Sequence, residues 1–177
     1  MKLEQTNRII IKIGSALLFN ETSGSLNKEW LNSLAEDVKY LRENDKEVII
    51  VSSGAIAMGA KDLDLDMKNM KMDMNQAVSA VGQIHLMGSF KSAFEKNEIK
   101  ISQILLTLDD TEQRRRSINA RRTIDTLLKL GIVPVVNEND TIATSEIRYG
   151  DNDRLASRVA QITSADCLIL LSNINGL

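Results

Sequence analysis

The chain of 177 residues has one cysteine, one proline and one histidine, and none of its apolar stretches approaches the ~20 residues of a membrane span. The single cysteine, Cys167, excludes a framework of intrachain disulfides and favours a reducing compartment. The N-terminus also lacks the apolar core of a signal peptide. We therefore expect a cytoplasmic protein with no membrane partner.

An excess of basic charge is also missing, because 22 Lys and Arg residues stand against 24 Asp and Glu residues, for a net charge of -2. Binding to a phosphate backbone requires a basic excess, so nucleic acid is not predicted as a partner. The only histidine, His85, falls in a long helical pattern from about Asn75 to Asn97. The chain therefore favours small-molecule chemistry that needs no histidine base.

Apolar runs are short and regularly placed, which predicts an α/β fold in one domain. Helical patterns separate the runs, so the strands should be parallel, and the uninterrupted apolar character indicates burial on both faces. Pro134 would normally place its strand at a sheet edge, and Cys167 is expected to be inert core. The predicted strands are 8–13, 47–51, 101–106, 132–136 and 167–171.

Small polar residues directly follow four of these strands. Because parallel strands end at the same edge of a sheet, where open α/β sheets bind ligands, these clusters predict one binding crevice. The four clusters are Gly14-Ser15, Ser52-Ser53-Gly54, Asn137 to Asp140, and Ser172-Asn173.

Lys12 is the only charge in the middle of the first apolar run. One interpretation is a cation that faces a phosphate, which Gly14 and Ser15 would allow to approach the backbone closely. The alternative is a solvated lysine at a sheet edge. No Walker loop sequence occurs in the chain.

Acidic and amide side chains follow the fourth predicted strand: Asn137, Asp140, Asp151, Asn152 and Asp153. They could orient lysines, hold Mg²⁺ through water or accept hydrogen bonds from a substrate ammonium group. Alternatively, they only form turns and cap a helix that begins near Arg154. Phosphorylation of a carboxylate would suit this residue set, since a carboxyl group with a pKa of ~4.3 is already an anion at neutral pH. Such chemistry needs positioning and charge neutralisation.

Five motifs together resemble, in order and spacing, those of the glutamate 5-kinases, which are members of the amino acid kinase family. They are Ile11 to Ser15, Val51 to Ile56, Ala80 to Gln83, Pro134 to Asp140 and Gly150 to Asp153. The resemblance covers essentially the whole chain. It implies a three-layer αβα sandwich around a mainly parallel sheet. It also implies ATP-dependent phosphorylation of the side-chain carboxylate of L-glutamate to L-glutamyl 5-phosphate, the first step of proline biosynthesis, with Mg²⁺ as cofactor.

The resemblance also implies roles for individual positions. Lys12 matches the lysine that neutralises the transferring phosphoryl group, and Asp153 matches the aspartate that organises catalytic lysines. The glutamate-binding positions are Ser53, Asn137, Asp140, Asp151 and Asn152, and the nucleotide-side positions are Lys12, Gly14, Ser15, Ser172 and Asn173. No metal ligand is implied. Dimers or tetramers and feedback inhibition by proline are further implications.

Two departures from the family pattern shape our expectation. Asn173 stands where the family usually has aspartate, and the family domain continues with more strands, helices and a second catalytic lysine. We therefore expect residues 1–177 to be the N-terminal, substrate-binding portion of an amino acid kinase domain, incomplete at its C-terminal side and without a PUA domain.

Two alternatives to glutamate phosphorylation remain. One is a glutamate- or proline-binding regulatory protein with impaired catalysis. The other is a different amino acid kinase, such as one acting on N-acetylglutamate. The acidic clusters disfavour this second enzyme, since an acylated amino group does not need acidic partners.

Overall fold

The computed structural model describes residues 3–20, 24–68, 70–143 and 151–173. Its centre is a five-stranded sheet in the order β3-β4-β2-β1-β5, with every described pairing parallel. The strands are β1 (Arg8–Ile13), β2 (Glu47–Val51), β3 (Ile101–Leu106), β4 (Val133–Glu138) and β5 (Cys167–Leu171). The predicted α/β class and parallel sheet are confirmed. Four strands have the predicted bounds, and β4 is shifted toward the polar cluster that follows it.

Seven α-helices and a short 3-10 turn (Leu3–Gln5) are described around this sheet: α1 (Ser15–Leu18), α2 (Lys28–Glu43), α3 (Ala55–Asp62), α4 (Met72–Glu95), α5 (Leu108–Glu112), α6 (Arg114–Lys129) and α7 (Asp151–Thr163). The prediction that the last of these helices begins near Arg154 is wrong, because α7 already begins at Asp151. Carboxylates are favourable in the first turn of a helix, where the helix dipole is positive. Within the described segments, no helix is both long and apolar enough to cross a membrane.

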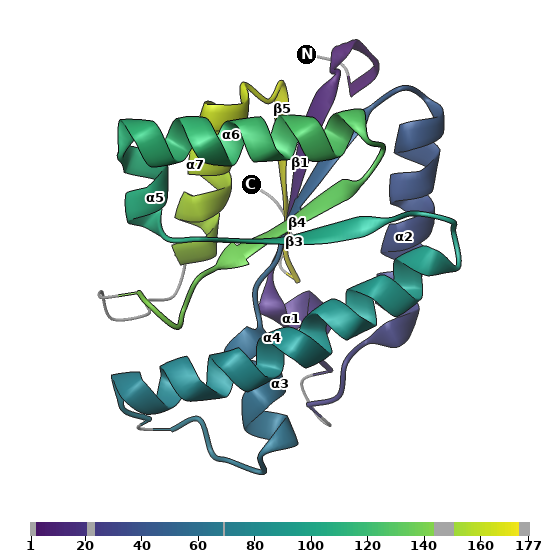
Figure 1. Cartoon of the computed structure of the whole chain (residues 1–177). Coiled ribbons are helices and arrows are strands. Elements are labelled where there is room, and N and C mark those ends of the chain that lie inside the picture. Colours follow the sequence, from purple (N-terminus) through teal and green to yellow (C-terminus); the bar gives the residue numbers. More distant parts are fainter. Residues whose placement is uncertain (1–2, 21–23, 69, 144–150, 174–177) are drawn as a thin grey trace.

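The helices form one layer on each face of the sheet (Figure 1). On one face, Ile9, Ile11 and Ile13 of β1 pack in a core with residues of α2 and α4. On the other face, Ile10 of β1 packs in a second core with residues of α6 and α7. Successive side chains of a strand point to opposite faces, so a strand covered by helices on both sides is apolar at nearly every position. This three-layer arrangement explains the uninterrupted apolar runs.

Pro134 does not lie in an edge strand, so that expectation is wrong: β4 pairs with β3 on one side and with β2 on the other. The amide of Val133 donates to the carbonyl oxygen of Lys100, at the start of β3, over 2.9 Å. Successive amides of a strand point to opposite sides, so the nitrogen of Pro134 faces β2. The described pairing of β4 with β2 begins only at Val135, and Pro134 therefore interrupts no hydrogen bond of that ladder.

Strand β5 differs from the prediction of burial on both faces. It is an edge strand of the described sheet, paired with β1, and the side chain of Leu170 is 54% exposed. Cys167 is a free cysteine that is half-buried and packs against the core on the α2 and α4 side. The apolar sequence of β5 alone could not distinguish a central strand from an edge strand.

Helices α3 and α4 pack with their backbones in contact, through two glycines. A Cβ atom at Gly82 would lie 1.8 Å from the carbonyl oxygen of Ala55, and one at Gly59 would lie 1.9 Å from that of Val78. No side chain fits at either position. This close crossing ties α4 to the helix that begins directly after the polar cluster of β2.

Candidate active site

The four predicted polar clusters lie along the same edge of the sheet. All strands are parallel, so the residues that follow β4, β2, β1 and β5 lie next to one another in that order. The crevice predicted from the sequence therefore corresponds to one continuous row of strand-end loops.

Hydrogen bonds connect each loop of this row to its neighbour. The amide of Ser52 donates to the carbonyl oxygen of Val136 over 2.8 Å, joining the ends of β2 and β4. The hydroxyl of Ser53 donates to the carbonyl oxygen of Ile13 over 3.0 Å, joining β2 to β1. The amide of Gly14 donates to the carbonyl oxygen of Leu171 over 3.3 Å, joining β1 to β5. The loops are thus held in fixed relative positions.

Lys12 is central in this row. It lies on the same face of β1 as Ile10, which directs its amine toward α7. There its Nζ atom lies 2.6 Å from Oδ1 of Asp153, the third residue of α7. The Lys12 side chain is only 14% exposed, whereas that of Asp153 is 50% exposed. A buried ammonium group without a partner would be costly, so Asp153 stabilises the charge of Lys12 at this edge.

Gly14 leaves open the space beside this ion pair. A Cβ atom at Gly14 would lie 3.9 Å from Nζ of Lys12 and 3.5 Å from the carbonyl oxygen of Leu171. Both are ordinary contact distances, so a side chain would fit without strain and would fill the space next to the amine. The absence of a side chain gives a ligand access to Lys12 from the β1–β5 side.

The loop after β2 turns sharply into α3. Gly54, the N-cap of α3, has a φ of 98°, a left-handed conformation that favours glycine. A Cβ atom there would also lie 2.6 Å from the ring of Phe19. The turn keeps Ser53 half-buried between the ends of β1 and β2.

The end of β4 carries buried polar side chains. Asn137 is 2% exposed and Asp140 is 8% exposed. The Oδ1 atom of Asn137 accepts a hydrogen bond from the amide of Glu138 over 2.9 Å, whereas its Nδ2 atom has no hydrogen-bond partner among the described residues. The buried Oδ1 atom of Asn152, in the first turn of α7, likewise has no such partner. Buried polar atoms are rarely left unpaired in proteins, and this donor and this acceptor are available to a ligand at the row of strand-end loops.

For the remaining predicted site residues, the structure gives the position in the fold but few contacts. Ser15 is half-buried at the start of α1, and Ser172 and Asn173 are exposed directly after β5. Asp151 begins α7, but its side chain and Gly150 lie outside the described residues. In the described part of the chain, no group of three or more His, Cys, Asp or Glu side chains could hold a metal ion.

The sequence analysis missed one contributor to this edge, which comes from α4. The hydroxyl of Ser79 donates to Oδ2 of Asp140 over 2.5 Å, and both side chains are buried. One turn earlier, Nε2 of Gln76 donates to the carbonyl oxygen of Ala143 over 3.0 Å. The available signal was a pair of polar residues, Gln76 and Ser79, spaced by three and therefore on one face of α4.

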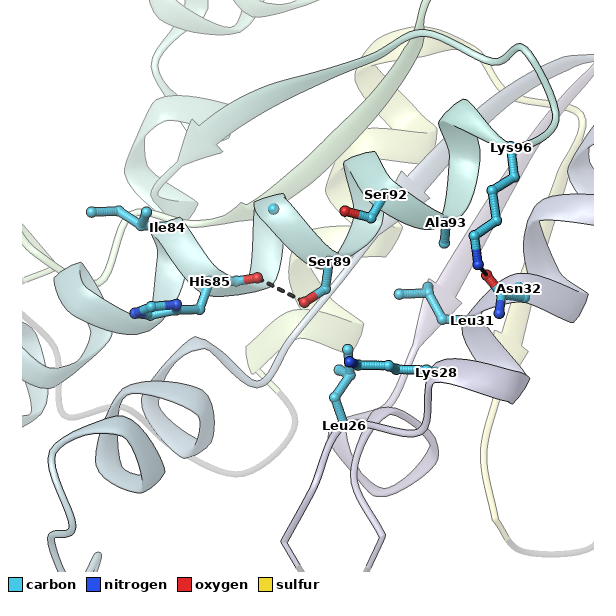
Figure 2. Close-up of a pocket in the computed structure, with 11 residues that line it drawn as sticks. Leu26, Lys28, Leu31, Asn32, Ile84, His85, Ser89, Ser92, Ala93 and Lys96 are labelled. Carbon is cyan, nitrogen blue, oxygen red and sulfur yellow. Dashed lines mark hydrogen bonds between the residues drawn. The ribbon is translucent and has the colours of Figure 1, made fainter.

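A separate pocket of about 520 Å³ lies between α2 and α4 (Figure 2). Its polar lining includes Lys28, His85 and Lys96, and none of the predicted site residues lines it. The ring of His85 lies 3.2 Å from the carboxylate of Asp62, and the amine of Lys96 donates to Asn32. His85 therefore lies outside the row of strand-end loops.

Comparison with known proteins identifies the family. The family model described as "Amino acid kinase family" matches residues 7–177. This chain belongs to the amino acid kinase family. The fold is similar to that of a solved structure, the isopentenyl phosphate kinase of T. acidophilum in a product complex. That structure has a TM-score of 0.64 and 14% sequence identity, over 97% of this chain and 72% of the other.

Relatives with higher sequence identity to this chain are named glutamate 5-kinases. The chain is 60% identical over 177 residues to a glutamate 5-kinase of Pelagibacter ubique (strain HTCC1062), covering 100% of this chain and 48% of that protein. It is 56% identical over 175 residues to glutamate 5-kinase 1 of Mesorhizobium japonicum, covering 99% of this chain and 46% of that protein. The chain thus spans about half the length of the curated relatives it matches.

Proposed function

We propose that this chain forms the glutamate-binding half of a kinase site that transfers the γ-phosphoryl group of ATP to the side-chain carboxylate of L-glutamate. The product would be L-glutamyl 5-phosphate, and the reaction would be the first step of proline biosynthesis. The observation that carries the proposal is the ion pair of Lys12 and Asp153, 2.6 Å apart, in the middle of the row of strand-end loops. The identity to glutamate 5-kinases supports the choice of acceptor.

The order of the strands supports a division of this site into two sides. The loops after β1 and β5 would bind the nucleotide through Gly14, Ser15, Ser172 and Asn173. The loops after β2 and β4 and the first turn of α7 would bind glutamate through Ser53, Asn137, Asp140, Asp151 and Asn152. Lys12, at the end of β1, belongs to the nucleotide-side strand that pairs with β2 of the glutamate side.

Lys12 would act on the transferring group. One carboxylate oxygen of glutamate forms a bond to the γ-phosphorus while the bond from that phosphorus to the bridging oxygen of ATP breaks, and ADP leaves. No proton needs to be removed, because the acceptor is already an anion at neutral pH. The ammonium group of Lys12 would stabilise the negative charge that spreads over the phosphoryl oxygens, and Asp153 would hold that ammonium in place.

The unpaired atoms support recognition of an amino acid. The Nδ2 atom of Asn137 is a hydrogen-bond donor suited to a carboxylate of glutamate, and the Oδ1 atom of Asn152 is an acceptor suited to its ammonium group. Asp140 would supply the negative charge for that ammonium group. An N-acetylated substrate has no charged amino group and would offer no cation to Asp140.

Mg²⁺ would reach this site with the nucleotide. In kinase sites Mg²⁺ is usually held by one or two carboxylates together with phosphates and water, so a dedicated cluster of protein ligands is not needed. Asp153 is the described carboxylate beside Lys12 and fits such a site. When bound, Mg²⁺ would neutralise charge on the phosphates.

The test is to incubate the purified protein with ATP, Mg²⁺, L-glutamate and hydroxylamine, and to measure glutamyl hydroxamate. N-acetylglutamate serves as the control acceptor. Hydroxamate formed with glutamate but not with N-acetylglutamate is the expected result. Hydroxamate formed preferentially with N-acetylglutamate would overturn the choice of acceptor.

A regulatory protein that binds glutamate or proline without turnover is the second candidate. It is favoured by Asn173, which follows β5 on the proposed nucleotide side and has no negative charge where the resemblance leads us to expect aspartate. The discriminating result is glutamate binding, measured by calorimetry, with no hydroxamate in the presence of ATP even when the second half of a glutamate 5-kinase domain is joined to this chain. Cytoplasmic location, assembly into dimers or tetramers and inhibition by proline complete the proposal.

A further inference from the structure

Ser79 connects α4 to the proposed glutamate side through a short hydrogen bond. Its hydroxyl lies 2.5 Å from Oδ2 of Asp140, the Ser79 side chain is fully buried and Asp140 is 8% exposed. Hydrogen bonds from a hydroxyl to a carboxylate are short and roughly twice as strong as neutral ones. A buried carboxylate requires such donors, so this contact contributes to the orientation of Asp140.

The helix that carries Ser79 is itself held in place on two sides. Its backbone contacts α3 at Gly59 and Gly82, where no Cβ atom fits. Beside Ser79, Gln76 donates to the carbonyl oxygen of Ala143 and so fixes the turn that follows Asp140. A serine on a rigid helix is therefore able to restrict the rotation of the Asp140 side chain.

We propose that Ser79 is a positioning residue, which holds the carboxylate of Asp140 in the orientation that accepts the α-ammonium group of the substrate. This inference rests on the proposed function, because it takes Asp140 as the partner of that ammonium group. Ser79 itself does not touch the substrate. Its contribution should therefore appear only with ligands that carry the ammonium group.

The experiment compares two ligands of the same length, L-glutamate and glutarate, of which glutarate lacks the amino group. Their dissociation constants are measured by calorimetry for the unaltered chain and for Ser79→Ala. We expect Ser79→Ala to weaken glutamate about tenfold and glutarate less than twofold. A merely structural role of Ser79 would weaken both ligands by the same factor, and that result would overturn the inference.

A matched control comes from the same helix. The hydroxyl of Ser89 donates to the carbonyl oxygen of His85 within α4, outside the row of strand-end loops. Ser89→Ala removes the same group from the same helix and should change neither dissociation constant by more than about twofold. A tenfold loss of glutamate affinity in Ser89→Ala would show that the effect of Ser79→Ala is not specific to Asp140.

Two further comparisons keep the inference testable if Ser79→Ala does not fold. Ser79→Thr and Ser79→Val place side chains of nearly equal shape at this position, and only the threonine keeps the hydroxyl. We expect Ser79→Thr to bind glutamate about tenfold more tightly than Ser79→Val, with equal affinity for glutarate. Equal glutamate affinities of the two variants would overturn the inference.

A double substitution tests whether Ser79 acts through Asp140. In the Asp140→Asn background, Ser79→Ala should cause no further loss of glutamate affinity. A second tenfold loss there would contradict the inference. If the unaltered chain binds glutamate and glutarate equally, the assignment of Asp140 in the proposed function fails first, and this outcome is distinct from any failure of Ser79 alone.

Discussion

The amine of Lys12 lies 2.6 Å from the carboxylate of Asp153, and this contact joins the end of β1 to the first turn of α7. The two residues are far apart in the chain and belong to different layers of the fold. Their ion pair places one half-buried cation at the end of β1, beside the loops after β1 and β2. A cation held there is suited to neutralising a phosphoryl group that moves from one side of the row to the other.

Lys12→Ala should lower the rate of glutamyl hydroxamate formation by about 100-fold or more, since removing one group that stabilises a transition state has effects of this size. Glutamate affinity, measured by calorimetry, should change by less than about threefold, because glutamate would bind to the β2 and β4 loops. Lys28→Ala, on α2 outside the site, is the control for loss of a lysine. Activity of Lys12→Ala above one third of the unaltered rate would refute the assigned role.

Asn137→Ala should weaken glutamate binding by about tenfold or more and lower the free energy of unfolding by about 1–3 kcal/mol. The binding loss is expected because the Nδ2 atom of Asn137 is buried without a partner among the described residues. The stability loss is expected because the Oδ1 atom that accepts from the buried amide of Glu138 is removed as well. Calorimetry and urea unfolding measure the two quantities. A loss of stability together with unchanged glutamate affinity would show that Asn137 is only structural.

Gly82→Ala should destabilise the protein by about 2 kcal/mol or more, because its Cβ atom would lie 1.8 Å from the carbonyl oxygen of Ala55 and would force α3 and α4 apart. Gly88→Ala is the matched control in the same helix, since nothing lies within 4 Å of its Cβ position. Alanine favours a helix more than glycine does, so this control should be stabilised by about 0.5–1 kcal/mol. Urea unfolding measures the free energy of unfolding of both variants. Equal changes in the two variants would contradict the close crossing of α3 and α4.

Asp166 should make stability depend on pH in the acid range. Hydrogen bonds from the backbone amides of Arg8 and Asn7, each 2.8 Å long, lower the pKa of the Asp166 carboxyl below its ordinary value of 3.8. A lowered pKa in the folded state means that this contribution is fully present above pH 3.8 and disappears as the pH falls through the folded pKa.

Asp166→Asn should therefore lower the midpoint of thermal unfolding at pH 7, and the difference from the unaltered chain should shrink below pH 3.8. Asp37→Asn, which removes an exposed carboxylate of α2, is the control. A difference between Asp166→Asn and the unaltered chain that stays constant from pH 7 to acid would argue against the described hydrogen bonds.

Much of the fold could be predicted because it depends on local patterns. The bounds of β1 and β2 follow from apolar runs that end at small polar residues. The gathering of Lys12, Ser53 and Asn137 at one edge follows from the parallel sheet alone, since parallel strands end on the same side.

The details that the sequence analysis missed depend on neighbours that are distant in the chain. Pro134 was expected at an edge because proline has no amide hydrogen to donate to a neighbouring strand. That absence is harmful only if the neighbouring strand needs the donor, and this depends on where β2 pairs with β4. The contact of Ser79 with Asp140 requires one face of α4 to meet the turn after β4. A helical pattern shows which residues share a face but does not show what that face meets.

The sequence by itself determined the strands, the parallel sheet, the row of polar strand ends and the resemblance to the amino acid kinase family, because apolar periodicity and turn residues act over a few positions. Only the tertiary structure decided the strand order, the pairing of Lys12 with Asp153 and the support of Asp140 by Ser79. These relationships arise when separate layers pack against one another, and the free energy of that packing depends on contacts that no local pattern records.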